Sequence, residues 1–270
     1  MSPDNYDDKC SLEKSLPENM LREFRSINGL KFCPYVGINY EHSVPRILVV
    51  GESHYAKGQG KADEVNDKNE LSFETIHDVL KGSVADDNVE THILYFIRIG
   101  QVLKDCLVEK PWESIAFMNK IQWMMSKASG DEEVKKRLNP QNHECQEDNH
   151  VFFSVVKMLR PDIVIFFSKR AYKSLPYYND SDKFDKTLLK LPGNVESIQG
   201  EAIENSWTPI YGKKMRGNYQ YTYKIKNEHN HYIVPVYSYI HLTGGRPDKT
   251  YLNEIHEDIS KLLIDLKDYE

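Results

Sequence analysis

The chain has 270 residues, of which 40% are hydrophobic and 28% charged, a composition typical of globular proteins that bury a sizeable core. Its 35 basic and 41 acidic residues give a net charge of −6, which excludes a general polyanion binder and leaves a local basic patch as the route to a nucleic acid. No apolar run reaches the roughly eighteen residues of a membrane span, and the first ten residues lack the blocks of a signal peptide. We therefore expect a cytoplasmic protein without a membrane partner.

The four cysteines, Cys10, Cys33, Cys106 and Cys145, are scattered and form no CxxC pair. Such spacing favours reduced thiols over a disulfide framework and does not indicate zinc or iron–sulfur ligation. We expect no metal and no cofactor.

Residues 1–30 begin with an acidic stretch that is poor in apolar side chains, which predicts a loose arm or a short helix, with structure starting near Met20. Residues 31–270 then form one domain. The segment from Phe32 to Gly37 predicts a docked extended segment. The apolar run 47–50 follows and ends at Gly51, as in a strand of a parallel sheet that is buried on both faces.

Further elements follow from periodicity and from apolar runs. Helices are expected over 73–80, over 91–103 with Thr91 as a plausible cap, over 151–159 and over 171–175. Strands are expected over 114–118, ending at Asn119, and over 163–167, while 126–149 predicts a polar helix or loop.

Regular periodicity is lost over 176–230, which predicts a variable insertion whose segment 219–226 alternates like an exposed hairpin strand. A last strand over 232–237, a polar loop over 241–246 and an amphipathic helix over 252–263 complete the chain. Four strand, loop and helix steps predict an α/β fold, a three-layer α/β/α sandwich whose mostly parallel central sheet has about four strands.

Ligands bind open α/β sheets at the carboxyl ends of the strands, so the residues just after each apolar run are the candidates for the site. The expected site joins Gly51, Glu52, Ser53, His54 and Tyr55 with Asn119, Ser168, His241 and Thr243. The alternative is that the individual residues cap helices or lie on the surface.

The order of these motifs resembles the uracil-DNA glycosylase superfamily. Gly51 to Tyr55 stands where that family has its water-activating motif, and Asn119 stands where an asparagine reads the base. The segment from Pro161 to Leu175 is similar to the family's third strand and helix, and the segment from His241 to Thr243 takes the place of H-P-S. These landmarks run from about Arg46 to Leu263, and each is short and degenerate.

The resemblance implies recognition of a nucleic-acid base, with N-glycosidic hydrolysis as the associated reaction. Base excision needs a flipped base held by stacking and edge hydrogen bonds, an oriented water, and a donor to the departing base. By this resemblance Glu52 would orient water, neutral His241 would donate to the base, Asn119 would bond the base edge and Tyr55 would stack. Gly51, Ser53, His54 and Thr243 would complete the substrate contacts.

The chain departs from the family pattern at three positions. Ser53 stands where one branch has a catalytic aspartate, His54 replaces the usual proline, and Leu242 replaces the proline of H-P-S. Fold and base recognition are therefore implied more strongly than uracil excision, and a non-catalytic binding module stays an alternative.

A basic stretch free of acidic residues, 205–227, alternates lysine with tyrosine and supports a DNA or other nucleic-acid partner. Its candidate contacts are Lys213, Lys214 and Arg216, with Arg246 in the loop after the last strand. A solvated β-hairpin is the other interpretation of this stretch.

Two hydrolase classes remain as alternatives. The strand followed by Gly51, Glu52 and Ser53 also resembles the G-D-S opening of the SGNH hydrolases, in which the serine is the nucleophile and His256 would stand for the late histidine. The Glu52 and His54 pair also resembles erythromycin-esterase-like proteins, where Glu and His act at a hydrolytic or metal site.

Overall fold

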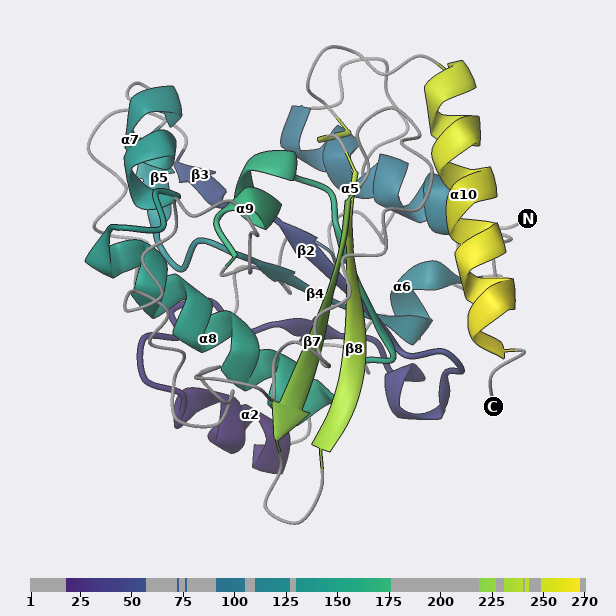
Figure 1. The fold of residues 1–270 in the computed structure, drawn as a ribbon, viewed down its shortest axis with the longest axis horizontal. Helices are drawn as coiled ribbons and strands as arrows, with labels where there is room; N and C mark the ends of the chain where they lie inside the picture. Colours follow the sequence, from purple (N-terminus) through teal and green to yellow (C-terminus); the bar gives the residue numbers. More distant parts are fainter. Residues whose placement is uncertain are drawn as a thin grey trace, which may run out of the picture.

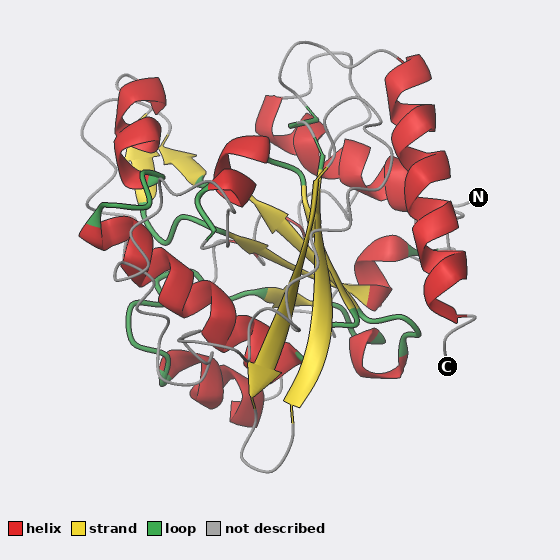
Figure 2. Ribbon diagram, viewed as in Figure 1, coloured by secondary structure: helices red, strands yellow, loops and turns green. Residues whose placement is uncertain are grey.

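The computed structural model describes residues 18–56, 72, 76, 91–104, 110–126, 130–175, 219–226, 231–239, 241–242 and 249–267. Strands and helices alternate along most of this part of the chain (Figures 1 and 2). The strands are β1 Tyr35–Val36, β2 Ile47–Gly51, β3 His54–Ala56, β4 Ile115–Asn119, β5 Met124–Ser126, β6 Ile163–Phe166, β7 Tyr219–Lys226 and β8 His231–Ser238. The helices are α2 Glu18–Arg25, the short 3-10 helix η2 Tyr40–His42, α5 Thr91–Leu103, α6 Pro111–Ser114, α7 Gly130–Arg137, α8 His143–Leu159, α9 Lys169–Lys173 and α10 Lys249–Lys267.

The central sheet has six strands in the order β1-β4-β2-β6-β8-β7. The four inner strands are parallel, and the two outer strands, β1 and β7, are antiparallel to their neighbours. The prediction of a mixed α/β fold with a mostly parallel sheet is confirmed. The two antiparallel edges account for the difference from the expected four strands. A separate two-stranded sheet pairs β3 with β5 in parallel.

Three of the four inner strands, β2, β4 and β6, are short and buried on both faces. Every residue of β2, β4 and β6 is buried, so the strands consist of continuous apolar runs instead of alternating patterns. The register aligns Val49 with Phe117 and Ile165, and Val50 with Met118 and Phe166. Successive residues of a strand point to opposite faces, so these two rows lie on opposite sides of the sheet.

Helices cover both of these faces. Phe96 of α5 packs its ring 5.1 Å from Phe117, in the row of Val49. Phe152 of α8 packs its ring 5.4 Å from Phe166, in the row of Val50. Helices α5 and α8 therefore lie on opposite faces, and α10 packs on α5 on the side of the sheet away from α8 (Figure 1).

Several segments with weak sequence patterns are ordered by tertiary contacts. The polar region 126–149 contains α7 and the first two turns of α8, whose Asp148 and Asn149 are buried. Strand β7 lies at the sheet edge, yet its Tyr223 and Ile225 are buried and Tyr223 contacts Phe153 of α8. Strand β7 is therefore covered on one face. The predicted N-terminal arm includes α2, whose Phe24 is fully buried.

Most of the predicted insertion 176–230 lies outside the described residues, as do residues 1–17 and most of the predicted helix 73–80. Within the described part of the chain, no helix combines the length and apolar character needed to cross a bilayer.

The start of β2 is tied to the start of β6 by one aspartate. Asp162 accepts hydrogen bonds from the backbone N–H of Arg46 at 2.7 Å and from its guanidinium at 2.8 and 3.2 Å. In return, the backbone N–H of Asp162 donates to the Arg46 carbonyl at 2.9 Å. These bonds fix the parallel register of the two central strands.

We expect Asp162→Ala to lower the free energy of unfolding by about 1–3 kcal/mol, because it leaves a backbone N–H and a guanidinium without their acceptor. Glu132→Ala is the matched control, since Glu132 pairs with Lys135 at an exposed site, and we expect less than about 0.5 kcal/mol. Denaturant unfolding measures both. Equal effects of the two changes would contradict this role of Asp162.

Candidate functional site

The residues at the carboxyl ends of β2 and β4 are neighbours. Gly51 lies directly opposite Asn119 in the parallel register, and Asn119 is 3% exposed. A Cβ atom on Gly51 would lie 2.3 Å from the Asn119 Oδ1 and 3.3 Å from the Tyr95 hydroxyl. A glycine is therefore required here, because any side chain would occupy the space of the asparagine amide.

Glu52 follows at the tip of β2 and is 4% exposed. Its carboxylate accepts four hydrogen bonds, two on each oxygen. Oε1 accepts from the Tyr55 hydroxyl at 2.9 Å and from the Arg170 Nη2 at 2.7 Å, while Oε2 accepts from the Ser168 hydroxyl at 2.7 Å and from the Arg170 Nε at 3.1 Å. A carboxylate has about four lone-pair positions, so this one is saturated.

Strand β6 and helix α9 supply three of these four bonds. Ser168 follows β6 and caps α9, accepting from the backbone N–H of Ala171 at 3.2 Å while it donates to Glu52. Arg170 then reaches Glu52 from the first turn of α9 as a bidentate partner, the strongest geometry for a carboxylate. Ser168 was expected at this tip, whereas Arg170 was not singled out from the sequence.

Tyr55 makes the fourth bond and stays protonated. Burial, reinforced by the negative charge of Glu52, raises the pKa of Tyr55 to about 12, so the hydroxyl keeps the proton that it donates. The residue is nevertheless 42% exposed. Tyr55 thus joins the buried carboxylate to the surface.

His241 comes from the loop after β8, and Tyr95 of α5 connects it to the other tips. The two rings stack at a centroid distance of 4.5 Å and an angle of 14°. Burial lowers the pKa of His241 and Arg170 lowers it further, against the opposing effect of Glu52. Since the ordinary value is about 6.5, the imidazole is neutral at pH 7.

The structure thus brings together Gly51, Glu52, Tyr55, Asn119 and His241 from the predicted site and adds Tyr95 and Arg170. A neutral imidazole and an amide can recognise a polar planar ligand through donors and acceptors. The predicted contacts Thr243, Arg246, Lys213, Lys214 and Arg216 lie outside the described residues.

His54 and Ser53 have different surroundings from Glu52. The His54 ring packs edge-on at 4.7 Å against Phe32, and its Nε2 lies 3.2 Å from the Ser72 hydroxyl. Glu52 instead bonds Ser168 and Arg170, so the two members of the erythromycin-esterase-like pair contact different groups. The Ser53 hydroxyl oxygen is buried, with no hydrogen-bond partner among the described residues.

His256 is the histidine that the SGNH-like alternative requires. Its Nδ1 lies 2.8 Å from the carbonyl of Val102 in α5. Val102 is seven residues beyond Tyr95, or roughly 10 Å along the helix. These contacts do not favour a Ser53 and His256 pair.

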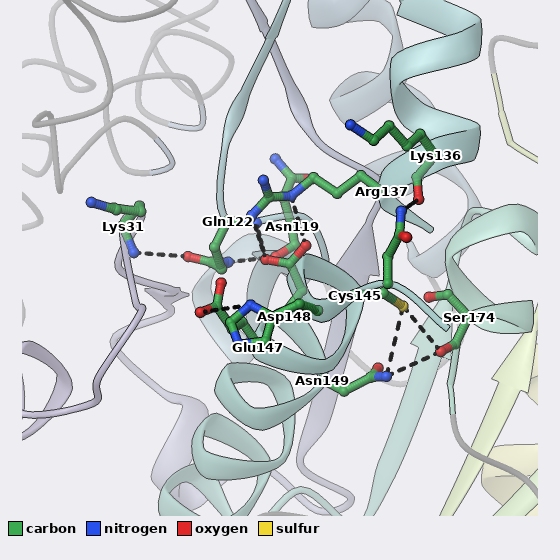
Figure 3. Close-up of polar contacts among 12 residues, drawn as sticks. Lys31, Asn119, Gln122, Lys136, Arg137, Cys145, Glu147, Asp148, Asn149 and Ser174 are labelled. Carbon is green, nitrogen blue, oxygen red and sulfur yellow. Dashed lines mark hydrogen bonds and ion pairs between the residues drawn. The ribbon is translucent and has the colours of Figure 1, made fainter. Parts of the chain in front are cut away.

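A second polar cluster lies behind the tip of β4, on the face covered by α8 (Figure 3). Asp148 of α8 accepts from the Arg137 guanidinium at 2.9 and 3.2 Å and from the backbone N–H of Gln122 at 3.1 Å. The Gln122 side chain donates to the Asn119 carbonyl at 2.7 Å. The cluster therefore fixes the backbone that carries Asn119.

Lys120 is the unusual member of this region. It is fully buried, and its Nζ makes no hydrogen bond to any residue that the structure describes. Burial lowers the pKa of Lys120, while the nearby Asp148 opposes this shift. The groups that act on the Lys120 amine include Asp148 and Cys145, both on α8.

The described residues contain no group of three or more His, Cys, Asp or Glu side chains that could hold a metal ion. Cys33 and Cys145, the two cysteines within the described ranges, are both buried thiols. The Cys145 thiol lies 3.7 Å from the Ser174 carbonyl, beside the Asn149 amide, which indicates a structural role.

In comparisons with known proteins, no family model matches the chain and no curated protein is significantly similar to it in sequence. The functional argument therefore depends on the geometry of the site.

We expect Gly51→Ala to displace the Asn119 amide and to lower the free energy of unfolding by about 1–3 kcal/mol through overpacking. In the double variant with Asn119→Ala, part of this loss is relieved, because the atom 2.3 Å away is gone. A double-mutant cycle by denaturant unfolding measures the coupling, expected at about 0.5–3 kcal/mol. Strict additivity would contradict the steric argument.

We expect Lys120→Met to leave stability unchanged or to raise it by up to about 4 kcal/mol at pH 7, because an apolar side chain replaces a buried amine. The folded-state pKa of Lys120 lies below its unfolded value of about 10.4. Between these two values the unfolded chain binds the extra proton, so wild-type stability rises with pH. Lys120→Met has no amine to titrate, so its stability does not show this rise with pH.

The measurement is denaturant unfolding as a function of pH, with the exposed Lys136→Met as the control that keeps the wild-type profile. A loss of more than about 1 kcal/mol in Lys120→Met would instead mean that the amine is charged and paired in the folded state.

Proposed function

We propose that the protein is a divergent member of the uracil-DNA glycosylase superfamily that recognises a nucleic-acid base, with hydrolysis of the N-glycosidic bond as its reaction. One observation carries the proposal. Glu52, Asn119 and His241, chosen from the sequence for this resemblance, follow three parallel strands of one sheet, and Tyr95 joins their surroundings. The carboxyl ends of parallel strands in an open α/β sheet are the usual position of a ligand site, which supports the proposal.

The proposal includes the finer architecture. Helices α5 and α8 on opposite faces of the sheet support a three-layer α/β/α sandwich over residues 31–270, with 176–230 as its variable insertion. The cytoplasmic location is part of the proposal and is based on the sequence alone.

In this mechanism the Asn119 amide bonds the base edge and the neutral His241 imidazole donates to an oxygen of the departing base. Such a donor stabilises the negative charge that develops on the leaving group. The Glu52 carboxylate faces the positive charge that develops at C1′, as in other glycoside hydrolyses. Tyr55, exposed at the edge of the site, offers a ring for stacking.

Activation of water by Glu52 requires one of its four donors to leave. Arg170 makes two bonds and Ser168 also caps α9, whereas Tyr55 makes a single bond. Replacing the Tyr55 hydroxyl by water therefore breaks fewer hydrogen bonds than replacing Arg170 or Ser168. A base that draws Tyr55 into a stack would release one lone pair of Glu52 for that water.

The second candidate is a non-catalytic binding module. Saturation of the Glu52 carboxylate favours it, because a carboxylate without a vacant lone pair orients no water. Ser53 at the position of a catalytic aspartate agrees with this alternative. The two candidates share the base contacts of Asn119 and differ in the reaction.

The test is incubation with single- and double-stranded oligonucleotides that carry uracil, hypoxanthine or other altered bases, scored for abasic sites and for binding at several salt concentrations. For a catalyst, we expect His241→Ala and Glu52→Gln to lower kcat by about 10²–10⁴-fold, typical of lost acid–base groups. Asn119→Ala weakens substrate binding. The matched control is His256→Ala, because His256 of α10 contacts the Val102 carbonyl of α5, away from the site.

Salt-dependent binding without abasic sites would favour the binding module. Neither binding nor cleavage of any oligonucleotide would refute the nucleic-acid proposal. Thermal unfolding of each variant separates loss of function from loss of fold, in particular for Glu52→Gln, which weakens the pair with Arg170.

A further inference from the structure

We propose that α5 positions His241 through two side chains on one helix face, Tyr95 and Arg98, and that these two are positioning residues of the site. The catalytic consequence rests on the proposed function, whereas the positioning itself does not. Neither residue was among the candidates from the sequence.

Tyr95 sets the plane of the imidazole. Its ring is 5% exposed and stacks on His241 at 4.5 Å and 14°, nearly parallel. Its hydroxyl donates to the Phe167 carbonyl, at 3.4 Å, and lies close to Gly51. The ring is thus fixed at both ends, which limits the orientations open to the imidazole on its face.

Arg98 holds the backbone that carries the imidazole. It lies three residues after Tyr95, on the same face of α5, and its Nη1 donates to the carbonyl of Leu242. The Leu242 side chain is fully buried. Ring and backbone of the segment 241–242 are therefore both fixed by one helix.

This arrangement explains how the site can lack the proline of H-P-S. Proline restricts the backbone after the histidine by fixing φ. Leu242 lacks that restriction, and here the hydrogen bond from Arg98 and the buried leucine side chain provide it instead. The substitution of the proline therefore does not by itself release His241.

Helix α5 can serve as a support because it is anchored elsewhere. Phe96, next to Tyr95, packs 5.1 Å from Phe117 of β4 and 5.9 Å from Trp112 of α6. At the other end, α10 packs against α5. The position of Tyr95 and Arg98 is thus set by the sheet and by two further helices.

Among the described residues, the charged and titratable groups around His241 include Glu52 after β2, Arg170 of α9, and Tyr95 with Arg98 of α5. Burial, to which the Tyr95 ring contributes, lowers the pKa of His241. Removing that ring admits water, so the pKa of His241 rises toward its ordinary value of about 6.5.

The experiment follows the His241 ring by NMR in the full chain with labelled histidine, assigned with His241→Gln. In Tyr95→Leu we expect the ring signals to lose the shift caused by the stacked tyrosine and the pKa of His241 to rise. Tyr95→Phe keeps the ring and is the matched control. Unchanged ring signals and an unchanged pKa in Tyr95→Leu would overturn the role of Tyr95.

Arg98→Met tests the second contact and is available even if Tyr95→Leu does not fold. We expect the backbone signals of Leu242 to shift and the His241 signals to broaden, with Arg98→Lys restoring most of the wild-type spectrum because lysine still donates. Wild-type spectra in Arg98→Met would overturn the role of Arg98.

If a base-excising activity is found, Tyr95→Leu lowers kcat with little change in KM. It also moves the acidic limb of the pH profile to higher pH, because the active neutral imidazole then protonates at a higher pH. If no oligonucleotide is cleaved or bound, the proposed function fails while the NMR result still decides the positioning. The two failures are therefore distinguishable.

Discussion

The negative charge of Glu52 is the constraint on which the site depends. A carboxylate that is 4% exposed is stable only with partners, and four donors from three residues, Tyr55, Ser168 and Arg170, surround this one. The bonds link the tip of β2 to the tip of β6 and to the start of α9. They also place a cation, Arg170, beside the histidine at the next strand. Loss of Glu52 would leave Arg170 and Ser168 without their common acceptor.

The same pair also acts on the pKa of His241. The Glu52 carboxylate raises the pKa of the imidazole and the Arg170 guanidinium lowers it, so the two charges act in opposite directions. Burial has the largest effect and leaves the ring neutral. Under the proposed function, a neutral donor suits a leaving base that acquires charge only in the transition state. The charges of the Glu52–Arg170 pair thus lie in the site while the His241 imidazole stays neutral.

The central strands could be predicted from the sequence because strands buried on both faces consist of apolar runs, as 47–51, 115–119 and 163–166 do. Gly51, Glu52 and Asn119 could then be predicted as site residues, because they lie at the carboxyl ends of those strands. Arg170 and Tyr95 could not be found, because their partners are distant in the chain and both occur in ordinary helical patterns. Arg98 could have been identified from the sequence, because it is the single Lys, Arg, Asp or Glu residue in the apolar helix Thr91–Leu103.

Under the proposed function, whether the site catalyses or only binds depends on Tyr55. Its pKa of about 12 keeps the hydroxyl protonated at neutral pH, so deprotonation does not release Glu52. Tyr55 can release Glu52 only by moving its side chain, and its 42% exposure leaves space for that movement. Under the proposed function a base enters where Tyr55 can stack on it. Stacking on Tyr55 and release of the carboxylate would then be one event, which confines water activation to the occupied site. A ligand too small to engage Tyr55 would be bound by Asn119 and left intact.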